Sequence, residues 1–190
     1  MLVSDQAPLS STGREPDVVE FVSEQLLQLL LHNGGSTTAV VEGLVGRRVD
    51  LRLRYQAIRR PDDDERVPMP SRDGLLWRLS TLELAGEALS DNVVWADLTV
   101  LPDEFARALF VGRTPIGRIL ARYEHRREPI SAGFVEAADL EARFAPAELP
   151  AGRLAMKEYR IWLRGVPALY LCEVFRPAII ACFWRRRFAD

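Results

Sequence analysis

The chain has 190 residues, 48% of them hydrophobic and 27% charged, with 25 basic side chains against 27 acidic ones. This length and apolar content suit a single domain with a sizeable core, and they exclude a collagen-like, low-complexity or mostly disordered chain. A net charge of −2 gives no electrostatic reason to expect binding to nucleic acid or to an anionic membrane. We therefore expect a small-molecule partner, no nucleic-acid partner and no membrane partner, in a monomer or a weak homo-oligomer.

The cysteines and histidines exclude several further classes of site. Cys172 and Cys182 are too few for a disulfide framework, and His32 and His125 lie far apart in the sequence. A zinc site or a histidine-based nucleophilic triad is not expected, and no metal is assigned. No segment reaches the roughly 18 consecutive apolar residues of a membrane helix, so we expect a cytoplasmic protein with reduced thiols.

Domain organisation is read from the start of the chain. Residues 1–16 are polar and lack periodicity, which predicts a flexible arm before a single domain at 17–190. Asp17 can cap a helix that runs to about Asn33, before the pair Gly34-Gly35. A second, short helix is expected over Thr38–Val45.

Strands and helices are mixed in the rest of the chain. From Arg48 the apolar period changes to two, which indicates a half-buried strand, and residues 59–73 form a charged, proline-rich loop. A helix should begin after Pro102, with Phe105, Leu109 and Phe110 facing the core, and a further helix after Pro115. The remaining expected strands are Leu75–Ala85 and Val93–Leu101, joined across residues 86–92, then Ile130–Ala138, Leu154–Leu163 and Ala168–Phe175. Without βαβ alternation, this order predicts an α+β fold, a single antiparallel sheet with helices against one side.

Two charged residues lie within apolar strands. Glu173 follows Leu169 and Leu171 on one strand face, where an unpaired carboxylate is costly, so it is paired, protonated or facing a polar cavity. Arg78 lies among bulky residues and suits an anion or an ion pair with Glu83 or Asp97. Either residue can be structural or can bind a ligand. Arg160 is a third candidate.

Four stretches carry a resemblance to a known family. They are the final hairpin from Tyr159 to Pro177, the segment Gly112–Leu120, Trp77-Arg78 with Gly86 and the following Leu98–Pro102, and Gly35–Thr38. In this order they resemble bacterial chorismate pyruvate-lyases and their chorismate-lyase-like relatives, over about residues 18–177. The resemblance implies an antiparallel sheet with helical flaps that enclose a buried site for an aromatic acid.

The resemblance also implies roles for four residues. Arg78 would hold the substrate carboxylate, Glu173 would face the ring hydroxyl and leaving group, and Ile116 and Thr37 would line the pocket. Arg78 and Glu173 would then be the catalytic pair of a cofactor-independent carbon–oxygen lyase that eliminates pyruvate from chorismate to give 4-hydroxybenzoate. Leu98 and Thr37 depart from the lyase pattern, and Leu98 stands where many lyases carry a cation.

Two alternatives keep the same pocket. One is an enzyme of specialised metabolism, a cyclase, dehydratase or isomerase acting on a polyketide-like intermediate. The other is a small-molecule-sensing domain, because the fold is related to the ligand-sensing domains of transcription regulators. The sensor is given less weight, since residues 1–16 are too short to hold a helix-turn-helix.

Overall fold

The computed structural model describes residues 18–63, 65–70, 73–145 and 147–187. The arm expected at residues 1–16 and the cap expected at Asp17 lie outside these ranges. The backbone of residues 18–20 is placed, and the side chains described begin at Phe21.

A six-stranded sheet forms the centre of the molecule. Its strands lie in the order β1-β2-β3-β6-β5-β4, and every neighbouring pair is antiparallel. This confirms the predicted α+β fold with one antiparallel sheet. The strands are β1 (Asp50–Arg59), β2 (Leu75–Leu84), β3 (Glu87–Ala96), β4 (His125–Glu136), β5 (Arg153–Leu163) and β6 (Val166–Phe175).

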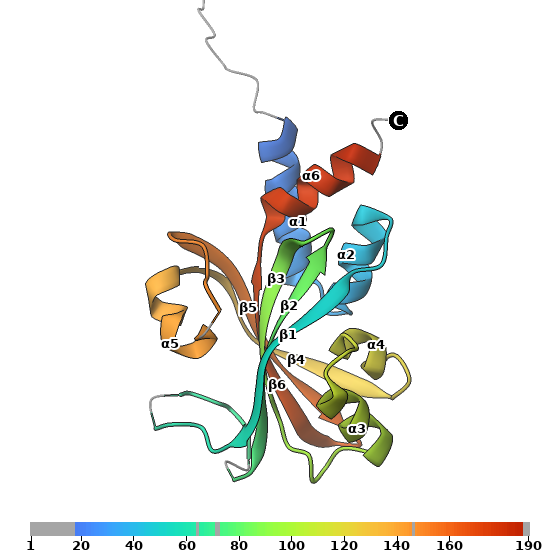
Figure 1. Ribbon diagram of the computed structural model, residues 1–190, viewed down its shortest axis with the longest axis vertical. Coiled ribbons are helices and arrows are strands. Elements are labelled where there is room, and N and C mark those ends of the chain that lie inside the picture. The colour runs from blue at the N-terminus through green and yellow to red at the C-terminus, as the bar shows by residue number, and fades with distance from the viewer. Residues whose placement is uncertain (1–17, 64, 71–72, 146, 188–190) are drawn as a thin grey trace, which may run out of the picture.

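Helices cover the two faces of the sheet unequally. On one face α1, α2 and α6 pack over one half of the sheet, while α3 and α4 pack over the other half (Figure 1). The short helices η1 and α5 cover the opposite face, so the expectation of helices on one side only is wrong. Leu140 and Phe144 bury their side chains there, because that face also carries large apolar residues. The helices are α1 (Val18–His32), α2 (Thr37–Val45), α3 (Asp103–Val111), α4 (Ile116–Leu120), η1 (Ala137–Leu140), α5 (Glu141–Phe144) and α6 (Pro177–Arg187).

The alternation along β6 decides which side chains meet the helices. Leu169, Leu171 and Glu173 lie on the face beneath α3 and α4, and Tyr170 and Cys172 lie on the other. Successive side chains of a strand point to opposite faces, so the sequence parity fixed this placement. We call the first the cavity face and the second the back face.

The β2–β3 hairpin is tighter than predicted. The turn is Ala85-Gly86, both with positive φ (53° and 84°), and β3 begins at Glu87. Residues 90–92 had been placed in the connection because they are polar. They are instead buried strand residues: the Asp91 carboxylate accepts a hydrogen bond from Thr81 Oγ1 at 2.7 Å and pairs with Arg176 at 2.6 Å. Because these hydrogen-bond and ion-pair partners satisfy the polar side chains, residues 90–92 can be buried in the strand.

Two further details differ from the sequence analysis. Phe110, expected in the core, is 56% exposed at the end of α3, while Phe105 and Leu109 are buried as expected. Helix α6 was not predicted, and it packs against α1 and α2. No helix in the described part of the chain has the length and apolar character needed to span a membrane.

Candidate functional site

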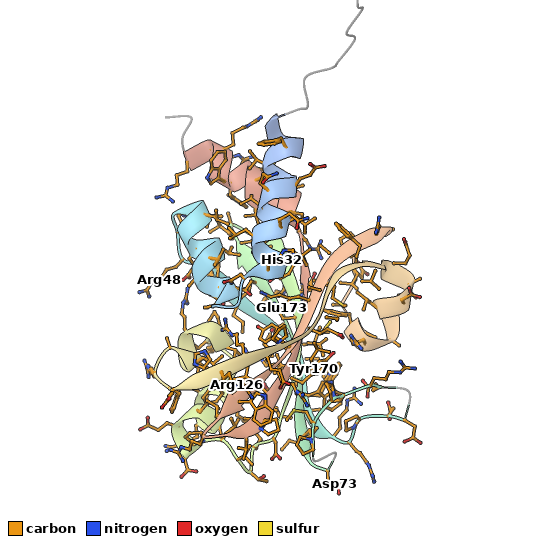
Figure 2. The ribbon with its side chains drawn as sticks, turned by 180° about the vertical axis from the view of Figure 1, so that it is seen from behind. His32, Arg48, Asp73, Arg126, Tyr170 and Glu173 are labelled. Carbon is orange, nitrogen blue, oxygen red and sulfur yellow. The ribbon has the colours of Figure 1, made fainter. Side chains whose placement is uncertain are left out.

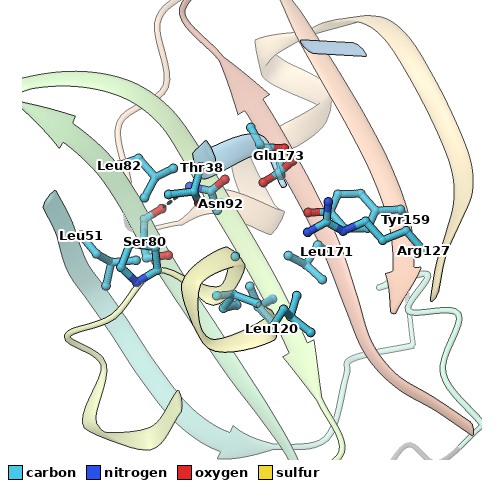
Figure 3. Close-up of a pocket in the computed structure, with 15 residues that line it drawn as sticks. Thr38, Leu51, Ser80, Leu82, Asn92, Leu120, Arg127, Tyr159, Leu171 and Glu173 are labelled. Carbon is cyan, nitrogen blue, oxygen red and sulfur yellow. Dashed lines mark hydrogen bonds between the residues drawn. The ribbon is translucent and has the colours of Figure 1, made fainter. Parts of the chain in front are cut away.

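A narrow cavity lies on the cavity face, between the sheet and the first turns of α2 and α4 (Figure 3). Its volume is only about 30 Å³. Small-ligand pockets hold roughly 300–1,000 Å³, so a ligand must displace lining side chains to enter. Its lining combines Thr37, Thr38, Leu51, Ser80, Leu82, Asn92, Val94, Pro115, Ile116, Gly117, Leu120, Arg127, Tyr159, Leu171 and Glu173.

The first turns of two helices form the roof. The Ser36 hydroxyl caps α2 by accepting from the Ala39 N–H at 3.3 Å, and this places Thr37 and Thr38 at the cavity. Helix α4 follows Pro115, and a Cβ at Gly117 would lie 2.4 Å from Ser36 Oγ. Only glycine permits this close approach of α4 to α2, so Gly117 sets the width of the roof.

Glu173 lies on the floor of the cavity and is 5% exposed (Figure 2). Thr37 Oγ1 donates to Glu173 Oε2 at 2.8 Å, and Lys157 Nζ lies 3.5 Å from the same oxygen. The carboxylate is therefore paired, but with the chain's single lysine rather than with an arginine. The Tyr159 hydroxyl also hydrogen-bonds this carboxylate, so Glu173 is held by groups from α2 and β5.

Lys157 connects this floor to the end of α1. Its Nζ donates to the carbonyls of Leu30 at 3.0 Å and Asn33 at 3.4 Å. Burial lowers the pKa of Lys157, while the charge of Glu173 acts in the opposite direction. One ammonium group thus joins the α1 terminus, the carboxylate on β6 and, through Thr37, the start of α2.

Arg127 and Tyr159 form the wall beside β4 and β5. The Arg127 guanidinium lies 5.6 Å from the centre of the Tyr159 ring, and Figure 3 shows the two side by side. Within the described part of the chain, Nε and Nη1 of Arg127 are buried without a hydrogen-bond acceptor. Burial and the nearby Glu173 carboxylate raise the pKa of the Tyr159 hydroxyl, which stays a donor at neutral pH.

The opposite wall offers neutral polar groups. Asn92 Nδ2 lies 3.4 Å from the carbonyl of Ser80 and 3.2 Å from Ser90 Oγ. Asn92 and Ser80 face the cavity beside the apolar Leu82 and Val94. The site therefore places a cation on one side, amide and hydroxyl groups on the other, and apolar side chains between them.

A second hollow adjoins the first and shares Arg127 and Tyr159 with it. It lies between the end of α1 and strands β4 and β5, and Lys157 also lines it. Its volume is about 270 Å³, so it is much larger than the first. Arg127 is thus placed where a ligand could reach it from either side.

Arg78 lies under α3 and does not line either hollow. It is 0% exposed, and its Nη1 donates to the Leu109 carbonyl at 3.1 Å. Neither Glu83 nor Asp97 pairs with it: Glu83 binds Arg52 and Arg54, and no ion pair to Arg78 is found among the described residues. Burial lowers the pKa of Arg78 to about 10, and its Nε and Nη2 have no acceptor in the part of the chain described.

The structure thus brings Thr37, Ile116 and Glu173 together and leaves Arg78 beside them, in the next cross-strand row of the same face. Arg160 lies outside the cavity, with Nη2 2.9 Å from Glu128. The sequence analysis missed four residues of the site. Arg127 precedes the expected start of the strand at Ile130, and Asn92 was expected in the connection between two strands. Tyr159 was considered only as part of a motif. Lys157 is the only lysine in the chain, and this was the one feature of the sequence that distinguished it.

Comparisons with known proteins show which solved structures are similar to this chain. No protein-family model and no curated protein sequence matches the chain. Among solved structures, the chain is similar to the effector domain of PhnF from Mycobacterium smegmatis, with a TM-score of 0.55 and 12% identity over 76% of this chain and 90% of that one. It is also similar to the longer PhnF chain from the same organism, with a TM-score of 0.56 and 12% identity over 76% of this chain and 65% of that one.

These likenesses establish the fold. It is the fold of the PhnF effector domain, so the similarity supports the expected α+β architecture and not the chorismate pyruvate-lyase itself.

Two expectations are corrected by the same finding. The expected carbon–oxygen lyase is wrong, because the matching structures are PhnF and its effector domain and not lyases, and this withdraws the chorismate reaction. The site roles expected for Arg78 and Glu173 stay predictions. The exclusion of nucleic acid is also wrong, because such effector domains work with a DNA-binding domain. Net charge misled here, because the charge of one domain does not exclude DNA binding by another.

Proposed function

We propose that this chain is a ligand-binding effector domain of a transcriptional regulator, and that its ligand is a small organic anion with at least one hydroxyl or carbonyl group. The observation that carries the proposal is Arg127 in the cavity wall, whose buried Nε and Nη1 have no acceptor among the residues that the structure describes. Burying unpaired guanidinium donors is costly, and an anionic ligand removes that cost.

The charges of the site favour a monoanion. Glu173 and Lys157 compensate one another at 3.5 Å, so Arg127 supplies one uncompensated positive charge. A carboxylate or a phosphate monoester oxygen suits its planar set of donors. Thr37, Asn92 and Ser80 would meet the neutral polar part of the ligand, while Ile116 would cover its apolar part.

Arg78 remains a second candidate for the anion, as the sequence resemblance implied. Arg78 lies in the cross-strand row next to that of Glu173, on the same face of the sheet. Its Nε and Nη2 have no acceptor among the described residues. A ligand that enters between α3 and α4 could reach it. The two arginines predict different outcomes: loss of Arg127 should abolish binding at the open wall, whereas loss of Arg78 should also loosen the end of α3.

The proposed signal leaves the site through α1 and α2. Thr37 lies in the first turn of α2 and bonds Glu173 directly, while the Leu30 carbonyl in the last turn of α1 is linked to the same carboxylate through Lys157. A ligand large enough to fill a cavity this narrow must move these side chains. We infer that the α1–α2 junction shifts on binding and transmits ligand occupancy to the DNA-binding partner.

The test is a thermal-denaturation screen with acids and their neutral analogues. We expect some small carboxylates or phosphate esters to raise Tm, their methyl esters or amides to have no effect, and Arg127→Gln to remove the shift. Arg126→Gln is the matched control, because Arg126 lies over Trp162 on the outer side of β4. Stabilisation by the neutral analogues, or an unchanged shift in Arg127→Gln, would contradict the proposal.

A further inference from the structure

The second hollow is the larger of the two spaces beside Arg127. Its volume is about 270 Å³, whereas the narrow cavity holds only about 30 Å³. Small-ligand pockets begin at roughly 300 Å³, so the second hollow is close to the size of such a pocket and the narrow cavity is far below it. The body of a ligand whose charged group binds Arg127 therefore fits on this side while the side chains stay where they are.

The lining of the second hollow is largely apolar. Pro129 and Ala132 of β4 pair with Tyr159 and Lys157 of β5, and the shift in pairing after Pro129 keeps both β4 residues on the cavity face. Leu31, in the last turn of α1, closes the hollow from the helix side. The hollow thus offers aliphatic carbon atoms and an aromatic ring, which favour a hydrocarbon group over a hydrated polar one.

The charged side chains that border the second hollow leave one cation uncompensated. Lys157 lies 3.5 Å from the Glu173 carboxylate, so these two charges offset one another. Glu158 also borders the hollow, but Arg143 pairs with its carboxylate on the back face. Nε and Nη1 of Arg127 have no acceptor among the described residues. Arg127 is therefore the group to which an anion at this site binds.

Arg127 and Tyr159 form a partition between two spaces of different chemistry (Figure 3). On one side Thr37 and Asn92 offer polar groups, in a volume that holds little more than a water molecule. On the other side lies the larger, apolar hollow. A ligand with a compact charged head and an apolar body matches this arrangement.

We propose that the ligand is an amphiphilic carboxylic acid, whose carboxylate binds Arg127 and whose hydrocarbon group occupies the second hollow against Leu31, Pro129 and Ala132. This inference rests on the proposed function, because it takes Arg127 as the anion site, and it adds the chemical class of the ligand. A body rich in hydroxyl groups does not suit the site, because it would lose water against apolar side chains without gaining hydrogen bonds.

A series of straight-chain acids tests the class of ligand. Calorimetric titration of the full chain with acetate, butyrate, hexanoate and octanoate should give an affinity that rises about fourfold for each methylene group that leaves water, until the chain outgrows the hollow. Equal affinity across the series, with binding lost in Arg127→Gln, would overturn this inference and leave the anion site in place. Binding of none of these acids would overturn both.

Two substitutions that fill the second hollow from opposite walls locate the hydrocarbon group. Ala132→Phe adds a ring from β4, and Gly34→Leu adds a side chain after α1, where a Cβ has nothing within 4 Å. Each variant should keep acetate affinity within about twofold and lose at least about tenfold in hexanoate affinity, because the buried methylene groups are displaced.

Ala138→Phe is the matched control for both substitutions. Ala138 is exposed on η1, over the opposite face, and lines neither space, so this variant should bind both acids like the wild type. Melting temperatures show which variants are folded, and either filling variant suffices for the test. Unchanged hexanoate affinity in a folded filling variant, or an equal loss in Ala138→Phe, overturns the placement of the hydrocarbon group.

Discussion

The two faces of the central sheet treat buried polar groups in opposite ways. On the back face, Glu158 accepts hydrogen bonds from Tyr170 at 2.6 Å and Ser131 at 2.7 Å and pairs with Arg143. On the cavity face, Arg127 and Arg78 each keep two buried N–H groups without an acceptor among the described residues. The Glu158 cluster thus satisfies its buried charge internally, whereas the two cavity-face arginines do not among the described residues.

This contrast separates structural polar groups from those available to a ligand. A satisfied cluster fixes the packing of its face and has nothing left to bind. Nearby on the back face, Arg59 lies 4.5 Å from the Trp77 ring and 4.4 Å from the Trp95 ring while it holds Glu65, so these tryptophans pack around a cation of the chain itself. They do not line the narrow cavity.

The largest expected effect on stability comes from a substitution on the back face. Glu158→Ala should lower the free energy of unfolding by about 2–4 kcal/mol, because it leaves Arg143 and Tyr170 without their shared acceptor. Binding in the narrow cavity, which Glu158 does not line, should not change. Burial tends to raise the pKa of Glu158, but the hydrogen bonds from Tyr170 and Ser131 and the charge of Arg143 outweigh it and lower this pKa.

A pH titration of stability checks the same group. A carboxyl whose folded pKa is below its unfolded value stabilises the protein above the unfolded pKa, and this contribution is lost as pH falls through the folded pKa. Chemical denaturation of Glu158→Gln should therefore show less acid sensitivity below about pH 4.5 than the wild type. Glu87→Gln, at an exposed position at the start of β3, is the control, and equal acid sensitivity in all three proteins would contradict the assignment.

A smaller effect is expected at the roof of the cavity. Gly117→Ala should cost about 1–3 kcal/mol, because the added methyl group meets Ser36 and Thr38 and forces α4 away from α2. Gly43→Ala on α2 is the control, since a Cβ there has nothing within 4 Å, and it should stabilise the protein by about 0.4–1 kcal/mol. Thermal unfolding of both variants measures this. A stable Gly117→Ala would mean that the roof is not tightly packed.

On the cavity floor, Glu173→Gln should change both binding and stability. Stability should fall, because the buried Lys157 ammonium loses its carboxylate. Among the described residues Glu173 is the only acidic residue that lines the narrow cavity, so the affinity of the folded variant for an anionic ligand should rise by roughly tenfold. Titration calorimetry measures the change. A loss of affinity would instead show that the ligand donates a hydrogen bond to the charged carboxylate.

The smallest effect concerns the two thiols. Burial raises the pKa of Cys172 on the back face to about 12, whereas Cys182 on α6 is exposed. An aromatic disulfide reagent should modify Cys182 rapidly and Cys172 only at the rate at which the sheet opens. Rapid modification of both thiols in the folded protein would show that the back face is less closed than described.

Sequence patterns predicted much of the fold and part of the site. Strand alternation placed Glu173 with Leu169 and Leu171, and the Arg164-Gly165 turn lies between β5 and β6 as predicted. Thr37 and Ile116 were found only through a family resemblance. Asn92 could not be found, because burial of a polar strand depends on partners distant in sequence. Arg127 could not be distinguished from 23 other arginines, since an absent acceptor is a property of the folded state.

The most direct test of the central contrast is titration calorimetry of the best stabilising anion against two arginine variants. Arg127→Gln should weaken binding at least tenfold with little change in Tm, since Arg127 has no acceptor to lose among the described residues. Arg143→Gln should lower Tm and leave Kd within about twofold of the wild type, because Arg143 serves Glu158 on the far face. Unchanged binding in Arg127→Gln, or lost binding in a folded Arg143→Gln, would contradict the account.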